Sequence, residues 1–274
     1  MIVVSGTKRS GTSMWMQVLA AAGFEPLGAA FPGRWKESIG DANPEGFFES
    51  RFRDGVYHAT NPLPGGIYVH PDRVRDRAVK VFPFGVRRSH RAFLDRVVVT
   101  MRPCAEYVRS RARLYAMESA HRDQELGERV TPVRYVPAYL EWFFENLTLL
   151  GDLRLRRIPH RVVTYHRALR KPQAVAEVIR WLGGDADAGV AELRAERRTQ
   201  VGGWTSDSEV PEYLRHLFDE LHAVHDEGRP IGDGLAERLR AARTELLPAF
   251  DEARRVQRVD QRRWASDVAE RVRR

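Results

Sequence analysis

The chain has one cysteine, few lysines and no long hydrophobic run. The single cysteine, Cys104, excludes an internal disulfide framework and is typical of a reducing, cytoplasmic environment. No apolar run approaches the roughly 18 residues that a membrane span requires, and no signal segment precedes the apolar run that begins at Ile2. We therefore expect a cytoplasmic protein that does not enter a membrane.

Lysine is scarce although the chain is strongly basic. It occupies only positions 8, 36, 80 and 171 among 45 basic residues, and arginine fills the others. Because arginine is so common here, a single arginine carries little information and a lysine carries more. The net charge of +8 makes nucleic-acid binding one hypothesis. Acidic residues at 260, 267 and 270 interrupt the Arg-rich segment 254–274, so we expect no nucleic-acid partner.

Four apolar runs, separated by helical patterns, predict an α/β fold with a parallel sheet covered on both faces. The runs span residues 2–4, 77–82, 95–101 and 161–165. We expect an irregular stretch over 26–49, and then a helix from Ser50 to about Ala59. The last third is charged and helical in pattern. The 274 residues suit one domain, with an α/β core over 1–184 and a helical extension over 185–274.

The first loop has the features of an anion-binding site. The segment Gly6-Thr7-Lys8-Arg9-Ser10-Gly11-Thr12-Ser13 connects the first strand to an amphipathic helix that begins at Met14. Backbone N–H groups and the helix dipole attract anions there, and two glycines five apart let the chain wrap a phosphate, as in a P-loop. Nucleoside triphosphatases have the pattern G-x-x-x-x-G-K-[ST], but Thr12 stands at the lysine position. The loop therefore favours a phosphate or phosphosulfate over Mg-ATP, and a P-loop kinase for a small metabolite is the alternative.

This loop resembles the one that sulfotransferases dependent on 3′-phosphoadenosine 5′-phosphosulfate (PAPS) use for the 5′-phosphosulfate, written PKSGTTW or PRSGTS. The segment from Val97 to Ser110 is similar to the strand and R-x-P…S pattern that binds the 3′-phosphate in that family. Here Pro103 directly follows Arg102, a small departure.

Two further segments are similar to the same family. The first covers residues 162–183. In the family, a strand ends in a tyrosine that lies near the adenine, and the following helix ends in Leu-Gly. Here the usual YEDL is replaced by Tyr165-His-Arg-Ala. Asn43-Pro-Glu-Gly-Phe-Phe-Glu49 is similar to the NPxG[YF]FE motif of bacterial members. The resemblance covers residues 2–183 in family order.

The resemblance implies a three-layer P-loop fold, PAPS as cofactor, and a cofactor-binding core over 1–184. We expect no metal, because the histidines are scattered and the cysteine has no partner. The expected cofactor-binding residues are Lys8, Arg9, Ser10, Gly11, Thr12, Ser13, Arg102, Ser110, Tyr165 and Arg198. For Tyr165, packing at a strand end is an equal alternative. For Arg198, a solvated surface position is the alternative.

Sulfuryl transfer needs a base and positive groups near the leaving oxygen. Arg9 or Lys8 can supply charge from the loop, and Lys80 matches the lysine of the KTH motif of cytosolic sulfotransferases. The histidine of that motif corresponds to Phe82, which cannot accept a proton. Because carboxylates act as the base in other branches of the family, we predict Glu49, Lys80 and Arg9 as catalytic. The other candidate bases are Glu45, His58 and Asp41.

The acceptor cannot be assigned from the sequence. Aromatic residues in the variable segments suit a small phenol, a sugar or a peptide tyrosine equally. The polar stretch 121–131 is either a lid or a surface loop. Apolar positions between 218 and 250 allow a homodimer as well as packing on the core.

Overall fold

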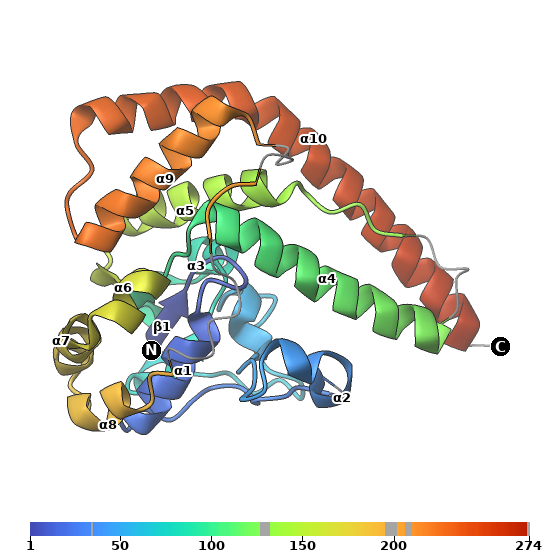
Figure 1. Cartoon of the computed structure of the whole chain (residues 1–274). Helices are drawn as coiled ribbons and strands as arrows, with labels where there is room; N and C mark the ends of the chain where they lie inside the picture. The colour runs from blue at the N-terminus through green and yellow to red at the C-terminus, as the bar shows by residue number, and fades with distance from the viewer. Residues whose placement is uncertain (34, 127–131, 195–201, 206–209, 273–274) are drawn as a thin grey trace.

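The computed structural model describes residues 1–33, 35–126, 132–194, 202–205 and 210–272 (Figure 1). Within these ranges the centre is a sheet of four parallel strands in the order β2-β1-β3-β4. The strands are β1 (Ile2–Ser5), β2 (Ala78–Lys80), β3 (Arg96–Val99) and β4 (His160–Val162). The expected α/β class and its parallel sheet are thus confirmed, and each of the last three strands is shorter than its apolar run.

Helices cover both faces of the sheet. Ile2 and Val4 belong to a core with α1 (Thr12–Ala21) and α7 (Pro172–Leu182). Val3, between them, belongs to the opposite core with α5 (Ala138–Leu155). Side chains of a strand alternate between its two faces. Each face here meets helices, so every position of β1 is buried, and this explains the unbroken apolar run at residues 2–4. At the edge strand β4, by contrast, Arg161 is exposed.

The C-terminal helices complete the second core. Phe218 on α9 (Glu212–Glu227) has its ring centroid 5.1 Å from that of Phe143 on α5. Leu246 on α10 (Asp233–Val272) belongs to the same core. Figure 1 shows α10 as a long helix that passes over α9 and α5 and then descends toward the end of α4 (Cys104–Leu126). The division into a core and an extension stays a prediction. The apolar residues of the extension belong to the same cluster as Val3 of the sheet.

Four shorter helices and four 3₁₀ turns complete the described elements. These are α2 (Trp35–Ile39), α3 (Pro83–Arg88), α6 (Tyr165–Arg170), α8 (Ala186–Ala191) and the 3₁₀ turns Gly40–Ala42, Arg51–Asp54, Pro71–Val74 and Arg91–Phe93. In the described ranges, every helix is too short or too polar to cross a membrane.

The predicted helix from Ser50 to Ala59 is wrong. Only the 3₁₀ turn Arg51–Asp54 forms, with the Ser50 hydroxyl accepting a hydrogen bond from the Phe52 N–H. Gly55 then has φ of +105°, and a Cβ there would lie 2.4 Å from the Gly85 carbonyl oxygen. The close approach of two distant backbone segments therefore ends the turn, and a local pattern cannot reveal such a contact.

Candidate functional site

The loop between β1 and α1 is held against the neighbouring strand ends. A Cβ at Gly6 would lie 2.3 Å from the carbonyl oxygen of Thr100, just after β3. The Thr100 hydroxyl donates to the Ser10 carbonyl at 2.8 Å. Gly11, at φ +93°, precedes α1, and a Cβ there would lie 2.6 Å from the Tyr165 ring. Both glycines are therefore required by close approach, and they fix the loop so that the N-terminus of α1 opens onto a cavity.

This loop cavity has a volume of about 690 Å³. It brings together the loop, the stretch 35–54, the end of β2 and α4. Of the predicted site residues, the following line it: Lys8, Arg9, Gly11, Thr12, Ser13, Glu49, Lys80, Arg102 and Tyr165. Ser10 and Ser110 are buried and do not line it, although Ser110 bonds Arg9. Arg198 lies outside the described residues.

Three arginines crowd one side of the loop cavity. The Arg9 Nε donates to the Ser110 hydroxyl at 3.2 Å. The Arg102 guanidinium lies 4.2 Å from the centroid of the Tyr165 ring. Burial, together with the positive charges of Arg102 and Arg113, lowers the pKa of Arg9 to about 10. A pKa lowered by like charges marks a region of positive potential, and a bound anion would relieve this repulsion.

A buried ion pair stands on another part of the cavity wall. The Lys80 Nζ lies 2.6 Å from Glu49 Oε1, with the two side chains 3% and 7% exposed. Lys80 also donates to the Phe47 carbonyl and, at 3.4 Å, to the Ser13 hydroxyl. Burial lowers the pKa of Lys80, although the neighbouring Glu49 opposes the change. Breaking such a pair by removing one partner costs about 3–5 kcal/mol.

The second oxygen of Glu49 is the notable atom of this pair. Glu49 Oε2 is buried and has no hydrogen-bond partner among the described residues. A buried acceptor without a donor is uncommon and calls for a physical explanation. Because Lys80 holds only Oε1, Oε2 can accept a proton or a hydrogen bond from a molecule in the cavity.

Of the three other candidate bases, two line the loop cavity and one does not. Asp41 and Glu45 line the loop cavity, on the same irregular stretch as Glu49. His58 does not line it. Its side chain is exposed, with its ring centroid 5.2 Å from that of Tyr57. Three of the four candidate bases therefore line the cavity, and among these three Glu49 alone is buried.

Sequence reasoning missed a charged cluster behind the loop. Lys8 places its Nζ 5.7 Å from the Tyr115 ring centroid, and Arg111 forms an ion pair of 2.5 Å with Glu141. The Tyr107 hydroxyl donates to Glu141 at 2.6 Å. Burial opposes the charge of Lys8, but Tyr115 and Glu141 outweigh it and raise the pKa of Lys8. The four-residue spacing of positions 107, 111 and 115 on one helix face was the available signal.

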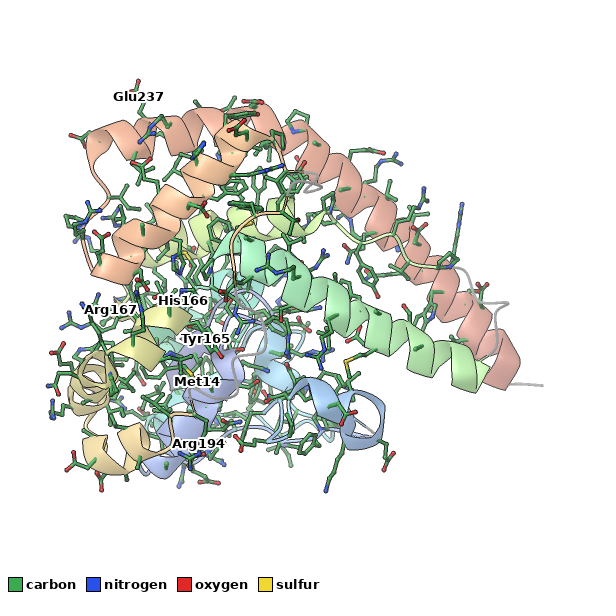
Figure 2. All side chains as sticks on the ribbon, in the orientation of Figure 1. Met14, Tyr165, His166, Arg167, Arg194 and Glu237 are labelled. Atoms are coloured by element: carbon green, nitrogen blue, oxygen red, sulfur yellow. The ribbon has the colours of Figure 1, made fainter. Side chains whose placement is uncertain are left out.

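Other cavity residues gave no signal in the sequence. Gln261 reaches the loop cavity from α10, and Glu192 and Arg194 reach it from the segment after α8. Figure 2 places Arg194 near Met14, on the same side of the molecule as Tyr165. These residues are far from the loop in sequence, so only the fold brings them there.

No protein-family model, no curated protein and no solved structure matches this chain. A functional assignment therefore depends on the geometry and chemistry of the loop cavity.

Proposed function

We propose that the chain is a sulfotransferase of three-layer P-loop architecture, which moves a sulfuryl group from PAPS to a hydroxyl or amine. The observation that carries the proposal is convergence. The loop, the Glu49–Lys80 pair and the Arg102–Tyr165 pair come from separate parts of the chain and line one cavity. Its volume of about 690 Å³ falls within the usual range of about 300–1,000 Å³ for small-molecule sites.

The residues present fit a nucleotide with phosphate groups at two positions. Glycine at 6 and 11 leaves room for backbone N–H groups to face the 5′-phosphosulfate at the start of α1. Arg102, aided by Arg9 and its partner Ser110, is suited to bind the 3′-phosphate, because guanidinium groups donate paired hydrogen bonds to phosphate. Tyr165 lines the same cavity, and in this proposal its ring lies beside the adenine.

The chain's own residues can perform the proton and charge transfers that the reaction requires. PAPS supplies the sulfuryl group, and adenosine 3′,5′-bisphosphate leaves with the electron pair of the broken S–O bond. Glu49 Oε2 accepts the proton of the attacking hydroxyl or amine. Lys80 and Arg9 stabilise the negative charge that develops on the departing phosphate oxygen. Lys80 also holds Glu49 in place through Oε1.

A P-loop kinase for a small metabolite is the alternative, supported by the outline of the loop alone. Transfer of label distinguishes the two functions. The chain is incubated with ³⁵S-labelled PAPS and a panel of phenols, sugars, amines and tyrosine peptides, and in parallel with γ-³²P-ATP and magnesium. We expect ³⁵S transfer to one class of acceptor. Transfer of ³²P without any ³⁵S transfer would establish the kinase instead.

A further inference from the structure

A second cavity of about 690 Å³ lies where the sheet ends at β4. Its lining comes from β4, α6, α7, the end of α9 and residues 228–230, and it shares no described residue with the loop cavity. We call it the edge cavity. In Figure 2, Arg167 marks its position on α6, below the C-terminal end of α9.

Positive charge dominates the lining of the edge cavity. Arg161 and Arg167 both line it, and neither forms an ion pair with a described carboxylate. The Arg161 guanidinium instead lies 5.5 Å from the centroid of the Trp181 ring. Glu177 is the single carboxylate among the described lining residues, and it is exposed. Two unpaired guanidinium groups at one cavity create a positive potential that attracts anions.

Two buried nitrogen atoms of the lining also lack partners. Arg167 Nε and His225 Nε2 are buried, and neither has a hydrogen-bond partner among the described residues. Buried polar atoms are nearly always hydrogen-bonded in proteins, so two at one cavity indicate a missing partner. Burial and the charges of Arg154 and His160 lower the pKa of His225 to about 4. The ring is therefore neutral at pH 7.

The Arg167 guanidinium packs closely against the C-terminal end of α9. Gly228 caps α9 at φ +74°, and a Cβ there would lie 2.1 Å from Arg167 Nη1. The guanidinium thus packs on bare backbone at the negative end of the helix dipole, which favours a cation. A donor held in place in this way loses little entropy on binding.

We propose that the edge cavity binds a small organic oxyanion. Its charged group lies between Arg161 and Arg167 and beside His225, and its apolar part lies against Val162, Val178 and Pro230. Guanidinium groups recognise carboxylate, phosphate and sulfate through the same paired hydrogen bonds. The site is separate from the proposed catalytic function, because the two cavities have no residue in common.

The test of this proposal measures the ¹⁵N chemical shift of His225 while an anion is added. ¹⁵N-detected spectra of the nine histidines are recorded during titration with 4-nitrophenyl phosphate, inorganic phosphate and, at matched ionic strength, sodium chloride. His225→Gln assigns the resonance. We expect a saturable shift with both phosphates, a lower Kd for the nitrophenyl ester, and no saturable shift with chloride.

Variants then test the arginines. Arg161→Gln and Arg167→Gln should each weaken binding about tenfold or more. Arg180→Gln on α7, exposed and outside the cavity, and Arg102→Gln in the loop cavity should leave it unchanged. Arg161 is exposed, and its guanidinium lies over the Trp181 ring on α7, so Arg161→Gln tests the proposal even where Arg167→Gln unfolds the chain. A shift that fails to saturate, or equal weakening by Arg180→Gln, would overturn the proposal.

Discussion

The loop cavity and the edge cavity each measure about 690 Å³, yet the chain builds them in different ways. The loop cavity depends on main chain, with Gly6 and Gly11 in close contact with other segments. The edge cavity depends on side chains such as Arg161 and Arg167, contributed by separate elements. A backbone-built site needs glycines at set spacings and so leaves a motif. A side-chain-built site in an arginine-rich chain leaves none.

The largest expected effect is on the transfer rate, and it distinguishes the role of Glu49 as the base from the role of the other cavity residues in binding. Glu49→Gln should lower the rate of sulfuryl transfer by about 10²- to 10⁴-fold, since an amide cannot accept the proton. Glutamine keeps a hydrogen-bond acceptor for Lys80 but not the negative charge, so the free energy of unfolding should also fall by about 3–5 kcal/mol. The affinity of the folded chain for adenosine 3′,5′-bisphosphate should stay within about threefold. Label transfer from PAPS under single-turnover conditions measures the rate.

The matched controls for this change are Glu45→Gln and Asp41→Asn, which alter the two other candidate bases that line the loop cavity. Both should retain transfer. A loss in either control, with activity kept in Glu49→Gln, would place the base on the other carboxylate.

The next prediction tests whether the loop cavity requires a residue without a side chain at position 11. Gly11→Ala places a Cβ 2.6 Å from the Tyr165 ring, at φ +93°. A displacement of the order of 1 Å costs about 100-fold in the rate of a preorganised site, and we expect that loss in the rate of label transfer from PAPS. Gly65→Ala is the control, because it has φ +84° and nothing within 4 Å. Equal losses in both variants would point to general backbone strain.

A smaller effect tests the independence of the two cavities. Arg102→Gln should weaken adenosine 3′,5′-bisphosphate about tenfold or more, since it removes a charged donor. The affinity for adenosine 5′-monophosphate, which lacks the 3′-phosphate, should not change. Arg167→Gln, the same substitution in the edge cavity, should leave both affinities intact. Identical losses for both nucleotides would contradict the assignment of Arg102 to the 3′-phosphate.

The last prediction concerns stability rather than activity, and it is the pH dependence of unfolding near the edge cavity. Burial lowers the pKa of both His222 and His225 to about 4. Below the ordinary histidine pKa the unfolded chain binds protons that the folded chain does not. The free energy of unfolding should therefore fall as the pH drops from about 6.5 toward 4, by on the order of 1 kcal/mol per histidine and pH unit.

Urea unfolding across this pH range measures the dependence, and His225→Gln should make it shallower. His216→Gln, exposed on the same helix, should not. An unchanged slope in His225→Gln would mean that this ring does not stay neutral in the fold.

The sequence predicted the elements whose signals are local. The run Ile2–Val4 became β1, and α7 begins at Pro172 and ends at Leu182 before Gly183, as proline and glycine at helix ends indicate. The short helix α3 begins at Pro83, directly after the apolar run 77–82, and no local pattern predicted it. The helix predicted after Ser50 is absent because Gly55 approaches Gly85, which is distant in sequence, so no local pattern could indicate the contact.

The sequence predicted the individual residues of the candidate site but not the side-chain contacts between them. Glu49 and Lys80 were chosen for separate reasons, and their ion pair joins positions 31 residues apart. Arg9 and Ser110 were likewise chosen separately and are joined across 101 positions. Local spacing cannot encode such contacts, and for the same reason nothing in the sequence indicated the edge cavity.

The most direct test of the proposed function is calorimetric titration of the whole chain with adenosine 3′,5′-bisphosphate and, separately, with ATP and magnesium. The loop has Thr12 at the lysine position of triphosphatases, and Arg102 and Ser110 lie at its side. We therefore predict that the bisphosphate binds at one site, more tightly than Mg-ATP. Tight binding of Mg-ATP with no binding of the bisphosphate would contradict the sulfotransferase proposal.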